Sequence, residues 1–459
     1  MIALLMACDG GTTTELPHPP PEHPAGLPEP FHAQPDFQLI EVTGLHRPRR
    51  EHRKLLIVSL DTVRADSLSP WGGRVEGFQG AVPAIPGPLS VARGEQVYKR
   101  AYSHFPQTCL SHWTMMTGVM PTLHGNTPRN RGSLWTGPTL AEIAKREGYA
   151  TAAFIGGQTL MDSQCGLSRG FDVYDDDFVI DPRDMRRHGR YVIGAATRWI
   201  DQQQGDWFAF VHLFDAHFPY TPEKDRFDTG YTGSINGDDA VLRPFRDGKQ
   251  TPRPRDVEHI RALYDSEIAE LAEWLKPLWT AVDEDTLVVV TSDHGESFEH
   301  DYWFNHKDSL MEGVLHVPLT ISGPGIKPGV VDEPIGLVDL TPNLLRLAGL
   351  PIDARMQGQV GGGRKVLIGL TDPWDPMGTH QYAEREGTQL RVESPEGTRC
   401  WSWPDEVEQA CVGTGHRSAY REELADLKGW QVDPPEGVQP MTPEECERLE
   451  ALGYVDCGR

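Results

Sequence analysis

Three stretches of the chain consist almost entirely of apolar residues and carry β-branched side chains near their centres: Lys54–Leu60, Phe208–Phe214 and Thr286–Thr291. They lack the alternation of polar and apolar residues that is typical of a strand with one face in water. Continuous apolar runs of this length are typical of strands that are covered on both faces, as in a parallel sheet. The pattern therefore predicts three buried parallel strands.

Between these runs, apolar residues recur at helical spacing over Thr139–Gly148, Met185–Gln203 and Val257–Val282. Strands that alternate with helices along the chain predict a mainly parallel sheet with helices on both faces. The expected fold class is α/β, an α/β/α sandwich around that sheet.

Each predicted strand is followed by acidic or histidine residues: Asp61 after the first, Asp215 and His217 after the second, and Asp293 and His294 after the third. Taken singly, an aspartate at a strand end is an ordinary turn former or helix cap. In parallel sheets, however, ligands bind beyond the carboxyl ends of the strands. Carboxylates gathered there would repel one another unless a cation neutralised them, so the joint pattern predicts a divalent metal site.

A short helix is predicted over Phe105–Gly118, with Thr108 near its N-terminus. Free amides at that position favour an anion, and a metal-bound alkoxide is a nucleophile that a neutral threonine is not. We expect Thr108 to be both a metal ligand and the nucleophile. The alternatives are that Thr108 only caps the helix, or that the adjacent Cys109 is the nucleophile.

The 459 residues include 43 Lys and Arg and 67 Asp and Glu, which gives a formal net charge of −24. This balance argues against a protein that binds nucleic acid, because such binding depends on cationic side chains that neutralise phosphates. It also disfavours adhesion to anionic lipid headgroups.

The N-terminus indicates export. Residues 1–8 end in Leu5-Met6-Ala7-Cys8, which resembles a bacterial lipobox with Cys8 as a candidate lipid anchor, and residues 9–52 form a proline-rich linker. The rival interpretations are a misassigned start and an untethered N-terminus. Four of the seven cysteines lie late in the chain (Cys400, Cys411, Cys446 and Cys457), which suits disulfides in an oxidising compartment. We expect a periplasmic or cell-surface lipoprotein.

Six segments, in order along the chain, resemble the motifs of sulfatases and the wider alkaline phosphatase superfamily. They are Ile57–Asp66, Thr108–Gly118, Leu213–Tyr220, Val290–Glu296, His306–Glu312 and Gly336–Gly349. The resemblance implies an alkaline phosphatase-like fold over residues 53–352. It fades beyond that point, and we expect residues 353–459 to form a smaller C-terminal domain. Four cysteines and the tryptophans Trp401, Trp403 and Trp430 lie in that last part.

The resemblance also implies roles for single residues. Asp61, Asp293 and His294 are expected to bind one divalent cation (Ca, Mn, Mg or Zn), and a second cation on His217 or Asp215 stays open. Lys307 and His217 are expected to contact the anionic oxygens of the substrate, joined by His306. His112 occupies the slot in which sulfatases carry an arginine.

Two departures from the family pattern shape the expected function. Typical sulfatases convert a cysteine in the nucleophile slot to formylglycine, but here that slot holds Thr108 and Cys109 falls one position later. Thr62 stands where many sulfatases have a second metal-binding aspartate. We therefore expect a metal-dependent hydrolase of sulfate or phosphate esters that uses a metal-activated threonine, acting on a small-molecule, glycan or lipid ester.

Two other functions stay open at this point. One is a phosphoglycerol- or phosphoethanolamine-type transferase, since such enzymes use a metal-bound threonine. The other is a surface lipoprotein that has kept the fold and lost turnover, because the segment Phe154–Gln158 lacks the lysine and histidine of the family.

Overall fold

The computed structural model describes residues 54–73, 95–125, 135–178, 186–371 and 381–413. The predicted strands and helices in these ranges are present, with bounds that differ by a few residues. The predicted lipobox and the proline-rich linker lie outside the described residues, as do Cys446 and Cys457. The proposed domain boundaries stay a prediction.

The central element is an eight-stranded sheet with the order β12-β2-β11-β7-β1-β6-β4-β5. Strand β1 pairs in parallel with both β6 and β7, and β4 pairs in parallel with β6 and β5. Among these strands, β11 is antiparallel to both of its neighbours. The strands are β1 (Lys54–Leu60), β2 (Glu95–Tyr98), β4 (Ala150–Phe154), β5 (Val173–Asp175), β6 (Trp207–Leu213), β7 (Thr286–Thr291), β11 (Leu319–Ser322) and β12 (Gly329–Val331).

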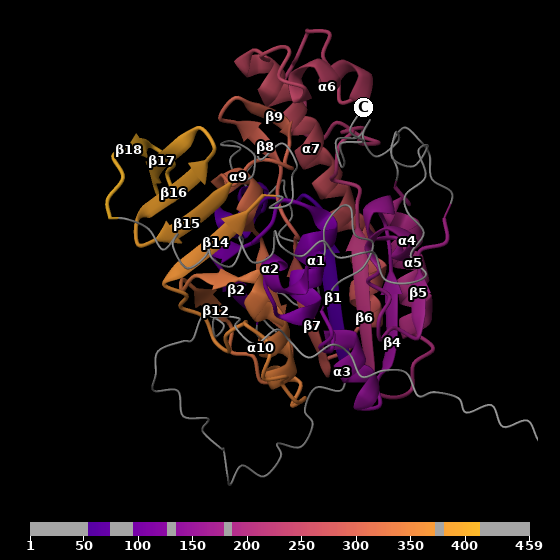
Figure 1. Ribbon diagram of the computed structural model, residues 1–459. Coiled ribbons are helices and arrows are strands. Elements are labelled where there is room, and N and C mark those ends of the chain that lie inside the picture. The colour runs from indigo at the N-terminus through magenta and orange to yellow at the C-terminus, as the bar shows by residue number, and fades with distance from the viewer. Residues whose placement is uncertain (1–53, 74–94, 126–134, 179–185, 372–380, 414–459) are drawn as a thin grey trace, which may run out of the picture. The chain divides into compact units, whose positions relative to one another are not determined.

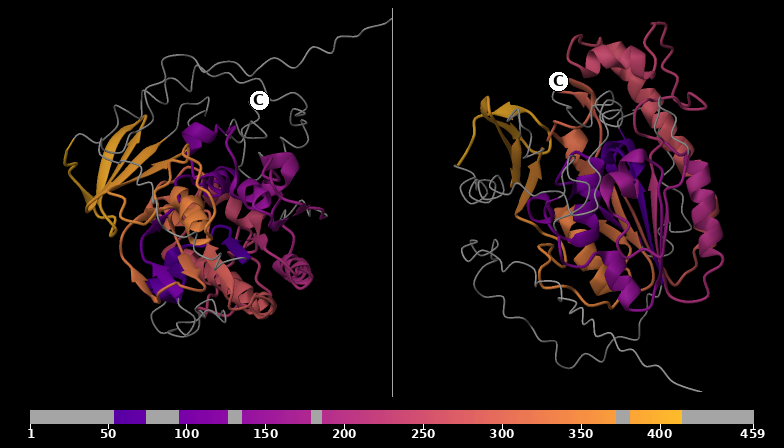
Figure 2. Two further views of the ribbon diagram at one scale, coloured as in Figure 1. Left: turned by 90° about the horizontal axis from the view of Figure 1, so that it is seen from below. Right: turned by 45° about the vertical axis from the view of Figure 1, so that its right-hand side comes forward.

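Helices cover both faces of this sheet, as Figure 2 shows. The apolar side chains of β1 divide between the two faces: Leu56 and Val58 pack in one core with α5 and α7, and Leu55 and Ile57 pack in another with α1, α3 and α10. The α/β/α sandwich around a mainly parallel sheet is therefore confirmed. The helices are α1 (Thr108–Thr117), α2 (Pro121–His124), α3 (Leu140–Arg146), α4 (Asp162–Cys165), α5 (Gly189–Ile200), α6 (Asp239–Arg246), α7 (Pro254–Trp274), α8 (Lys276–Ala281), α9 (Glu312–Leu315) and α10 (Leu340–Leu347).

Local signals in the sequence explain where several helices begin. Helix α3 starts at a capping box, in which Thr139 and Glu142 satisfy each other's backbone amides. Helix α7 starts with Pro254 at its first position, where the missing amide hydrogen is not needed. The single helix expected over Val257–Val282 is divided into α7 and α8, and Pro277 lies in the first turn of α8.

A second, antiparallel sheet follows the main one and holds the described part of the C-terminal region (Figure 1). Its strands run in sequence order: β14 (Val366–Leu370), β15 (Tyr382–Glu386), β16 (Gln389–Ser394), β17 (Gly397–Ser402) and β18 (Glu408–Gln409). Trp401 and Trp403 share a core with Tyr102, and the Trp403 indole donates a hydrogen bond to the Tyr102 hydroxyl at 3.0 Å. A disulfide joins Cys400 to Cys411.

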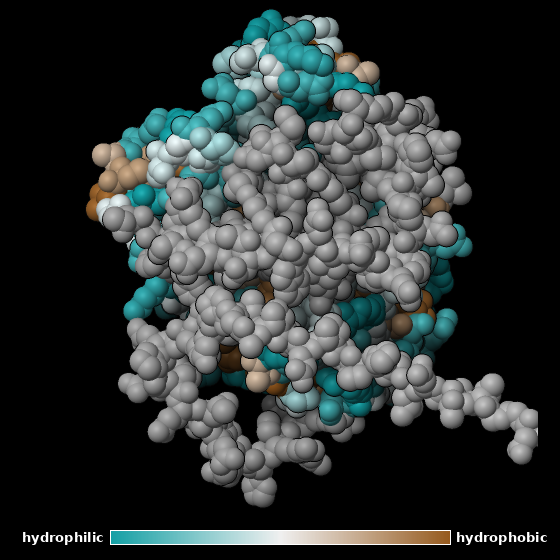
Figure 3. Space-filling model, viewed as in Figure 1, coloured by the Kyte–Doolittle hydropathy of each residue, from teal (hydrophilic) through white to brown (hydrophobic). Residues whose placement is uncertain are grey.

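Five short strands form two further small sheets among the described residues. β3 (Ala101–Tyr102), β10 (His316–Val317) and β13 (Ile335–Gly336) form a three-stranded sheet, and β8 (Ser297–Glu299) and β9 (Tyr302–Asn305) form a hairpin. The hairpin leads directly into His306 and Lys307. None of the helices among the described residues combines the length and apolar composition needed to cross a lipid bilayer. In the view of Figure 3, the described surface around α6, at the top, is mainly hydrophilic.

Candidate metal and nucleophile site

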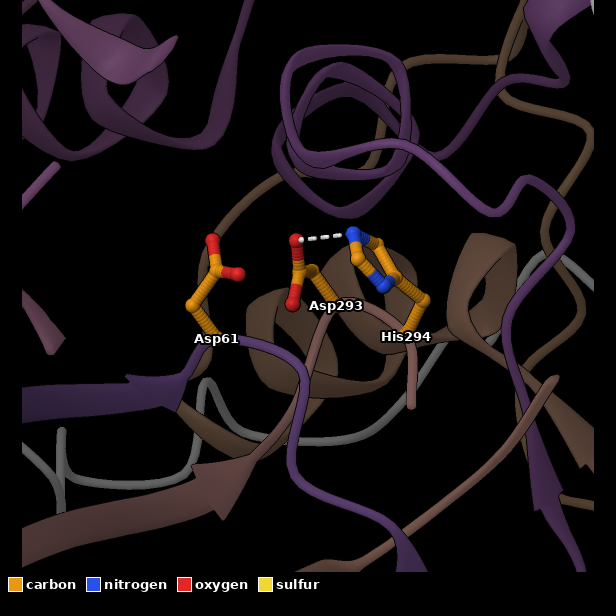
Figure 4. Close-up of side chains that lie close together, drawn as sticks. All are labelled: Asp61, Asp293 and His294. Carbon is orange, nitrogen blue, oxygen red and sulfur yellow. Dashed lines mark ion pairs between the residues drawn. The ribbon is translucent and has the colours of Figure 1, made fainter. Parts of the chain in front are cut away.

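Asp61, Asp293 and His294 meet beyond the carboxyl ends of β1 and β7, which are paired in the sheet. Each offers a ligand atom, and these atoms lie within 4.8 Å of one another. Figure 4 shows the two carboxylates turned toward each other, with the His294 ring beside Asp293. All three side chains are fully buried. In the described part of the chain, this is the one group of three or more acidic, histidine or cysteine residues with metal-binding geometry.

Thr108 is the first residue of α1 and lies next to this group. Its hydroxyl is close enough to Asp61 to counteract the rise in the pKa of that carboxyl. We name the set Asp61, Thr108, Asp293 and His294 the metal corner. Within the described residues, four of its buried polar atoms have no hydrogen-bond partner: Asp61 Oδ1, Thr108 Oγ1, Asp293 Oδ2 and His294 Nε2.

Orphaned polar atoms of this kind are costly in a protein interior unless something binds them. The electrostatics of the metal corner support the same conclusion. Burial and the neighbouring Asp293 charge raise the pKa of Asp61 well above its ordinary value, and burial raises the pKa of Asp293. A divalent cation would remove both penalties, so these residues fit a metal ion.

The His294 ring is oriented as a metal ligand requires. Its Nδ1 faces the Gly295 carbonyl at 3.0 Å, which leaves the lone pair on Nε2, 3.2 Å from Asp293 Oδ2 (Figure 4). Burial lowers the pKa of His294 to about 4, so the imidazole is neutral at pH 7. The donor set of two carboxylates, one hydroxyl and one imidazole does not select one divalent metal among those expected.

Backbone geometry after β1 holds Asp61 in place. Thr62 adopts a positive φ of 57°, which is unfavourable for a β-branched residue. Its amide donates to Asp293 Oδ1 at 3.3 Å, and its carbonyl accepts from the Tyr264 hydroxyl at 2.7 Å. The Thr62 hydroxyl donates to the Asp61 carbonyl, so in this structure it binds the backbone. Strained residues that are fixed by their surroundings in this way are concentrated at functional sites.

His217 and His306 lie side by side, with their Nε2 atoms 3.3 Å apart. The His306 ring also stacks on His294, with ring centroids 4.2 Å apart. Both rings turn Nδ1 toward a backbone carbonyl, that of Phe218 for His217 and that of Pro106 for His306. Burial lowers the pKa of both histidines well below the ordinary value. Lys307, half-buried, contributes to that lowering at His306.

The His112 side chain is turned inward, toward the Thr108 backbone and Asp293. It is fully buried; Nδ1–H donates to the Thr108 carbonyl at 2.7 Å, and Nε2 accepts from the Ser59 hydroxyl at 2.9 Å. Its Nδ1 is 3.8 Å from Asp293 Oδ2. This geometry indicates that His112 supports the backbone of α1 and the Asp293 carboxylate.

Asp215 does not join the metal corner, although it follows β6 as predicted. Its Oδ1 accepts from the Gly189 amide at 2.9 Å at the start of α5, and it faces His188. The sequence pattern places Asp215 at the correct edge of the sheet, but the side chain turns to cap a helix. A second cation on Asp215, which the sequence left open, would therefore not share the ligands of the Asp61 group.

Two functional residues were not predicted from the sequence. The His212 ring donates from Nε2 to Asp61 Oδ2 at 2.9 Å, and Tyr264 holds the turn at Thr62. His212 is paired in register with Ser59 of β1. A histidine within an otherwise apolar strand is a signal that could have identified it.

Cys109 is bonded to Cys165 by a disulfide. The two cysteines are 56 residues apart in the sequence, and the fold brings the start of α1 and the end of α4 together. With its sulfur in this bond, Cys109 does not serve as the rival nucleophile.

Comparison with known proteins agrees with the motifs. The family model described as Sulfatase matches residues 53–350. Arylsulfatase K of Xenopus laevis is 26% identical over 317 residues, which cover 57% of this chain and 58% of that protein. Arylsulfatase K of Danio rerio is 39% identical over 110 residues, covering 22% of this chain and 21% of that protein. The matches thus span between about a fifth and three fifths of these relatives.

Solved structures share the fold. A phosphonate monoester hydrolase from Silicibacter pomeroyi has a TM-score of 0.60 at 20% identity, covering 82% of this chain and 94% of that one. A 2-O GAG sulfatase has a TM-score of 0.60 at 17% identity, covering 85% and 97%. Because the Sulfatase model spans well over half of its residues, this chain belongs to the sulfatase family, within the alkaline phosphatase superfamily.

Proposed function

We propose that this protein hydrolyses a sulfate or phosphate ester in a metal-dependent reaction, with Thr108 as the nucleophile. One observation carries the proposal. The Thr108 hydroxyl is buried beside the Asp61 carboxylate and next to Asp293 and His294, and no backbone amide among the described residues donates to it. A helix cap would use its hydroxyl to accept a backbone amide, and Thr108 does not do so.

Asp61, Asp293, His294 and Thr108 would hold the cation. When bound, a divalent cation lowers the pKa of a nearby hydroxyl and withdraws charge from an ester oxygen. The protein supplies the rest of the chemistry. Thr108 Oγ1 attacks sulfur or phosphorus and displaces the alcohol, and water then releases the covalent intermediate.

The histidine pair and Lys307 are suited to bind the anionic oxygens. Each ring directs Nδ1–H to a carbonyl, so the facing Nε2 atoms of the neutral His217 and His306 carry lone pairs. An anionic ester oxygen at this position favours uptake of a proton from solvent on Nε2, which then donates a hydrogen bond to that oxygen, and the Lys307 ammonium adds a positive charge nearby. His112 and His212 position Thr108 and Asp61, respectively.

The names of the relatives support the substrate class. They include arylsulfatase, choline-sulfatase and phosphonate monoester hydrolase, and a 2-O GAG sulfatase has the same fold. We propose a monoester of sulfate or phosphate on a small molecule, glycan or lipid. A transferase would use the same intermediate and differ only in the acceptor, an alcohol in place of water.

The test is a panel of one aryl sulfate, one aryl phosphate monoester and one phosphodiester, with metal content measured. Thr108→Ala should lower kcat at least about a thousandfold, since it removes the attacking atom, whereas Thr108→Ser should keep measurable turnover. Adding an acceptor alcohol distinguishes transfer from hydrolysis by the product formed. A Thr108→Ala variant within tenfold of wild type would refute the proposed nucleophile.

We further propose export to the periplasm or cell surface. Two disulfides among the described residues support an oxidising compartment. Metabolic labelling with a fatty acid, comparing wild type with Cys8→Ser, tests the lipid anchor. Absence of label on the wild-type protein would refute the anchor without affecting the enzymatic proposal.

A further inference from the structure

The residue after the proposed nucleophile is covalently tied to another part of the fold. Cys109, in the first turn of α1, forms a disulfide with Cys165, the last residue of α4. One turn further along α1, the Trp113 indole donates to the Cys165 carbonyl at 2.9 Å. Trp113 and Cys165 are both completely buried. The start of α1 is therefore attached to a single residue of α4 at two successive turns.

Helix α4 and the turn before it are anchored to the edge of the sheet. The Asp162 amide donates to Asp176 Oδ2 at 2.7 Å, just beyond β5. The Tyr174 hydroxyl of β5 donates to the Leu160 carbonyl at 2.6 Å. The disulfide thus connects the nucleophile helix, through α4, to the strands of the main sheet.

On its other side, α1 contacts Asp293 of the metal corner, and the segment just before α1 contacts His306. The Ser111 hydroxyl donates to the Asp293 carbonyl at 2.7 Å, and the Pro106 carbonyl faces His306 Nδ1 at 2.8 Å. Thr108 lies between these contacts and the disulfide. Among the described residues no backbone amide caps its hydroxyl, and Gln107 provides no side-chain cap. The position of Thr108 Oγ1 therefore depends on the backbone of this first turn and on the Asp61 carboxylate beside it.

We propose that the Cys109–Cys165 disulfide is a positioning device that holds Thr108 in the geometry needed for attack. The inference rests on the proposed function, in which Thr108 is the nucleophile. Cys109 and Cys165 act through Thr108 and touch no substrate. Because rates depend steeply on the alignment of reacting atoms, releasing the disulfide slows the chemical step and leaves substrate binding largely intact.

The same device makes turnover sensitive to dithiols. A reducing dithiol donates two electrons and two protons; the S–S bond breaks to give the Cys109 and Cys165 thiols, and the dithiol is oxidised to its own disulfide. Reoxidation restores the bond. Turnover should fall and recover with this cycle.

The chain offers a matched control in its second disulfide, Cys400–Cys411, which lies in the C-terminal sheet. We would compare Cys109→Ala, Cys165→Ala and the double variant with Cys400→Ala/Cys411→Ala, measuring kcat and KM on the substrate that wild type turns over best. The first three should lose about tenfold or more in kcat, with KM changed less than about twofold. The Cys400→Ala/Cys411→Ala control should have the kcat of wild type, and dithiol should lower its turnover as it does that of wild type.

Wild-type kcat in the Cys109 and Cys165 variants, at a temperature well below their Tm, would overturn the proposal. If the disulfide only stabilised the fold, its removal would lower Tm without slowing turnover. If the variants fail to fold, folded wild type is reduced at 25 °C while circular dichroism and thiol content are followed. Unchanged kcat with the Cys109–Cys165 bond open would equally overturn it.

Two measurements do not depend on turnover. Non-reducing peptide mapping should recover Cys109 linked to Cys165; a modified or unlinked Cys109 would refute the proposal. Hydrogen exchange should be faster at residues 108–112 in the double variant than in the Cys400/Cys411 control. Failure of the proposed function would be recognised separately. Thr108→Ala would then retain turnover, while residues 108–112 would still exchange faster in the Cys109/Cys165 double variant than in the control.

Discussion

Two clusters of charged residues adjoin the end of β1, and they differ in whether their carboxylates have partners of opposite charge within the chain. In the metal corner, the described residues place no lysine or arginine against Asp61 or Asp293, and four ligand atoms lack hydrogen bonds. A second set begins three residues after Asp61, and we name it the arginine cluster: Arg64, Asp66, Arg261, Asp265 and Glu299.

In the arginine cluster, each carboxylate faces a guanidinium. Arg64 contacts Asp66 at 2.7 Å and Glu299 at 2.8 Å, and Arg261 contacts Asp66 at 3.0 Å and Asp265 at 3.3 Å. These charges are neutralised within the chain. The comparison teaches that burial of charge is not by itself the mark of a functional site; uncompensated burial is.

The largest effect should come from removing a ligand of the metal corner. Asp293→Asn should lower kcat/KM by roughly a thousandfold, because the charge that holds the cation is lost. Asp66→Asn, in the arginine cluster, is the control and should leave kcat/KM within about tenfold of wild type while lowering Tm. Equal losses of activity in both variants would contradict the division into two kinds of cluster.

Breaking the arginine cluster should instead affect stability. Arg64→Met leaves Glu299 and Asp66 without that guanidinium, and the free energy of unfolding should fall by about 3 kcal/mol. Urea unfolding with metal present measures the loss. Metal affinity, followed by titration, should stay near the wild-type value, and a large drop in that affinity would show that the clusters are coupled.

His212 should tune the metal corner without being a ligand. His212→Asn removes the donor to Asp61 Oδ2, and metal affinity should fall about 10- to 100-fold. His104→Asn is a suitable control, because His104 is also buried but directs Nδ1 to the Ile368 carbonyl, in the C-terminal sheet. An unchanged dissociation constant in His212→Asn would refute the role assigned to that ring.

The metal-free protein should lose stability as pH rises. Burial raises the pKa of Asp61 and Asp293 in the folded state, so the folded state binds more protons than the unfolded state above the unfolded value of about 3.8. The free energy of unfolding of the metal-free form is thus not reduced by these two carboxyl groups below that pH. It falls as the pH rises from that value toward their raised pKa in the folded state. The Tm difference between metal-loaded and chelated protein should widen from pH 4.5 to pH 7.5; a constant difference would contradict this.

The smallest effect should come from a contact between the β8–β9 hairpin and the C-terminal sheet. His300 Nε2 lies 2.7 Å from Glu406 Oε2, and this hydrogen bond raises the pKa of His300. The stabilisation is present below the unfolded pKa of about 6.5 and is lost as pH rises through the raised value. His300→Gln should cost less than about 1 kcal/mol at pH 6 and almost nothing at pH 9, as urea unfolding would measure.

Sequence patterns alone were enough to predict the three central strands, the main helices around them, and the residues that meet beyond β1 and β7. Apolar runs that end in Asp61 and Asp293 are local patterns, and parallel strands bring their carboxyl ends to one edge whatever the loops do. Thr108 could be placed there because its helix follows the first strand and carries a motif of its own.

The contact partner of each side chain around the metal corner could be known only from the three-dimensional fold. Cys109 meets Cys165 because α1 packs against α4, Asp215 turns to the start of α5, and His112 points inward to the Thr108 carbonyl. His212 reaches Asp61 because β6 pairs with β1 in a register that places it opposite Ser59. These outcomes depend on the side-chain direction and on contacts between residues far apart in the chain, and spacing along the sequence encodes neither.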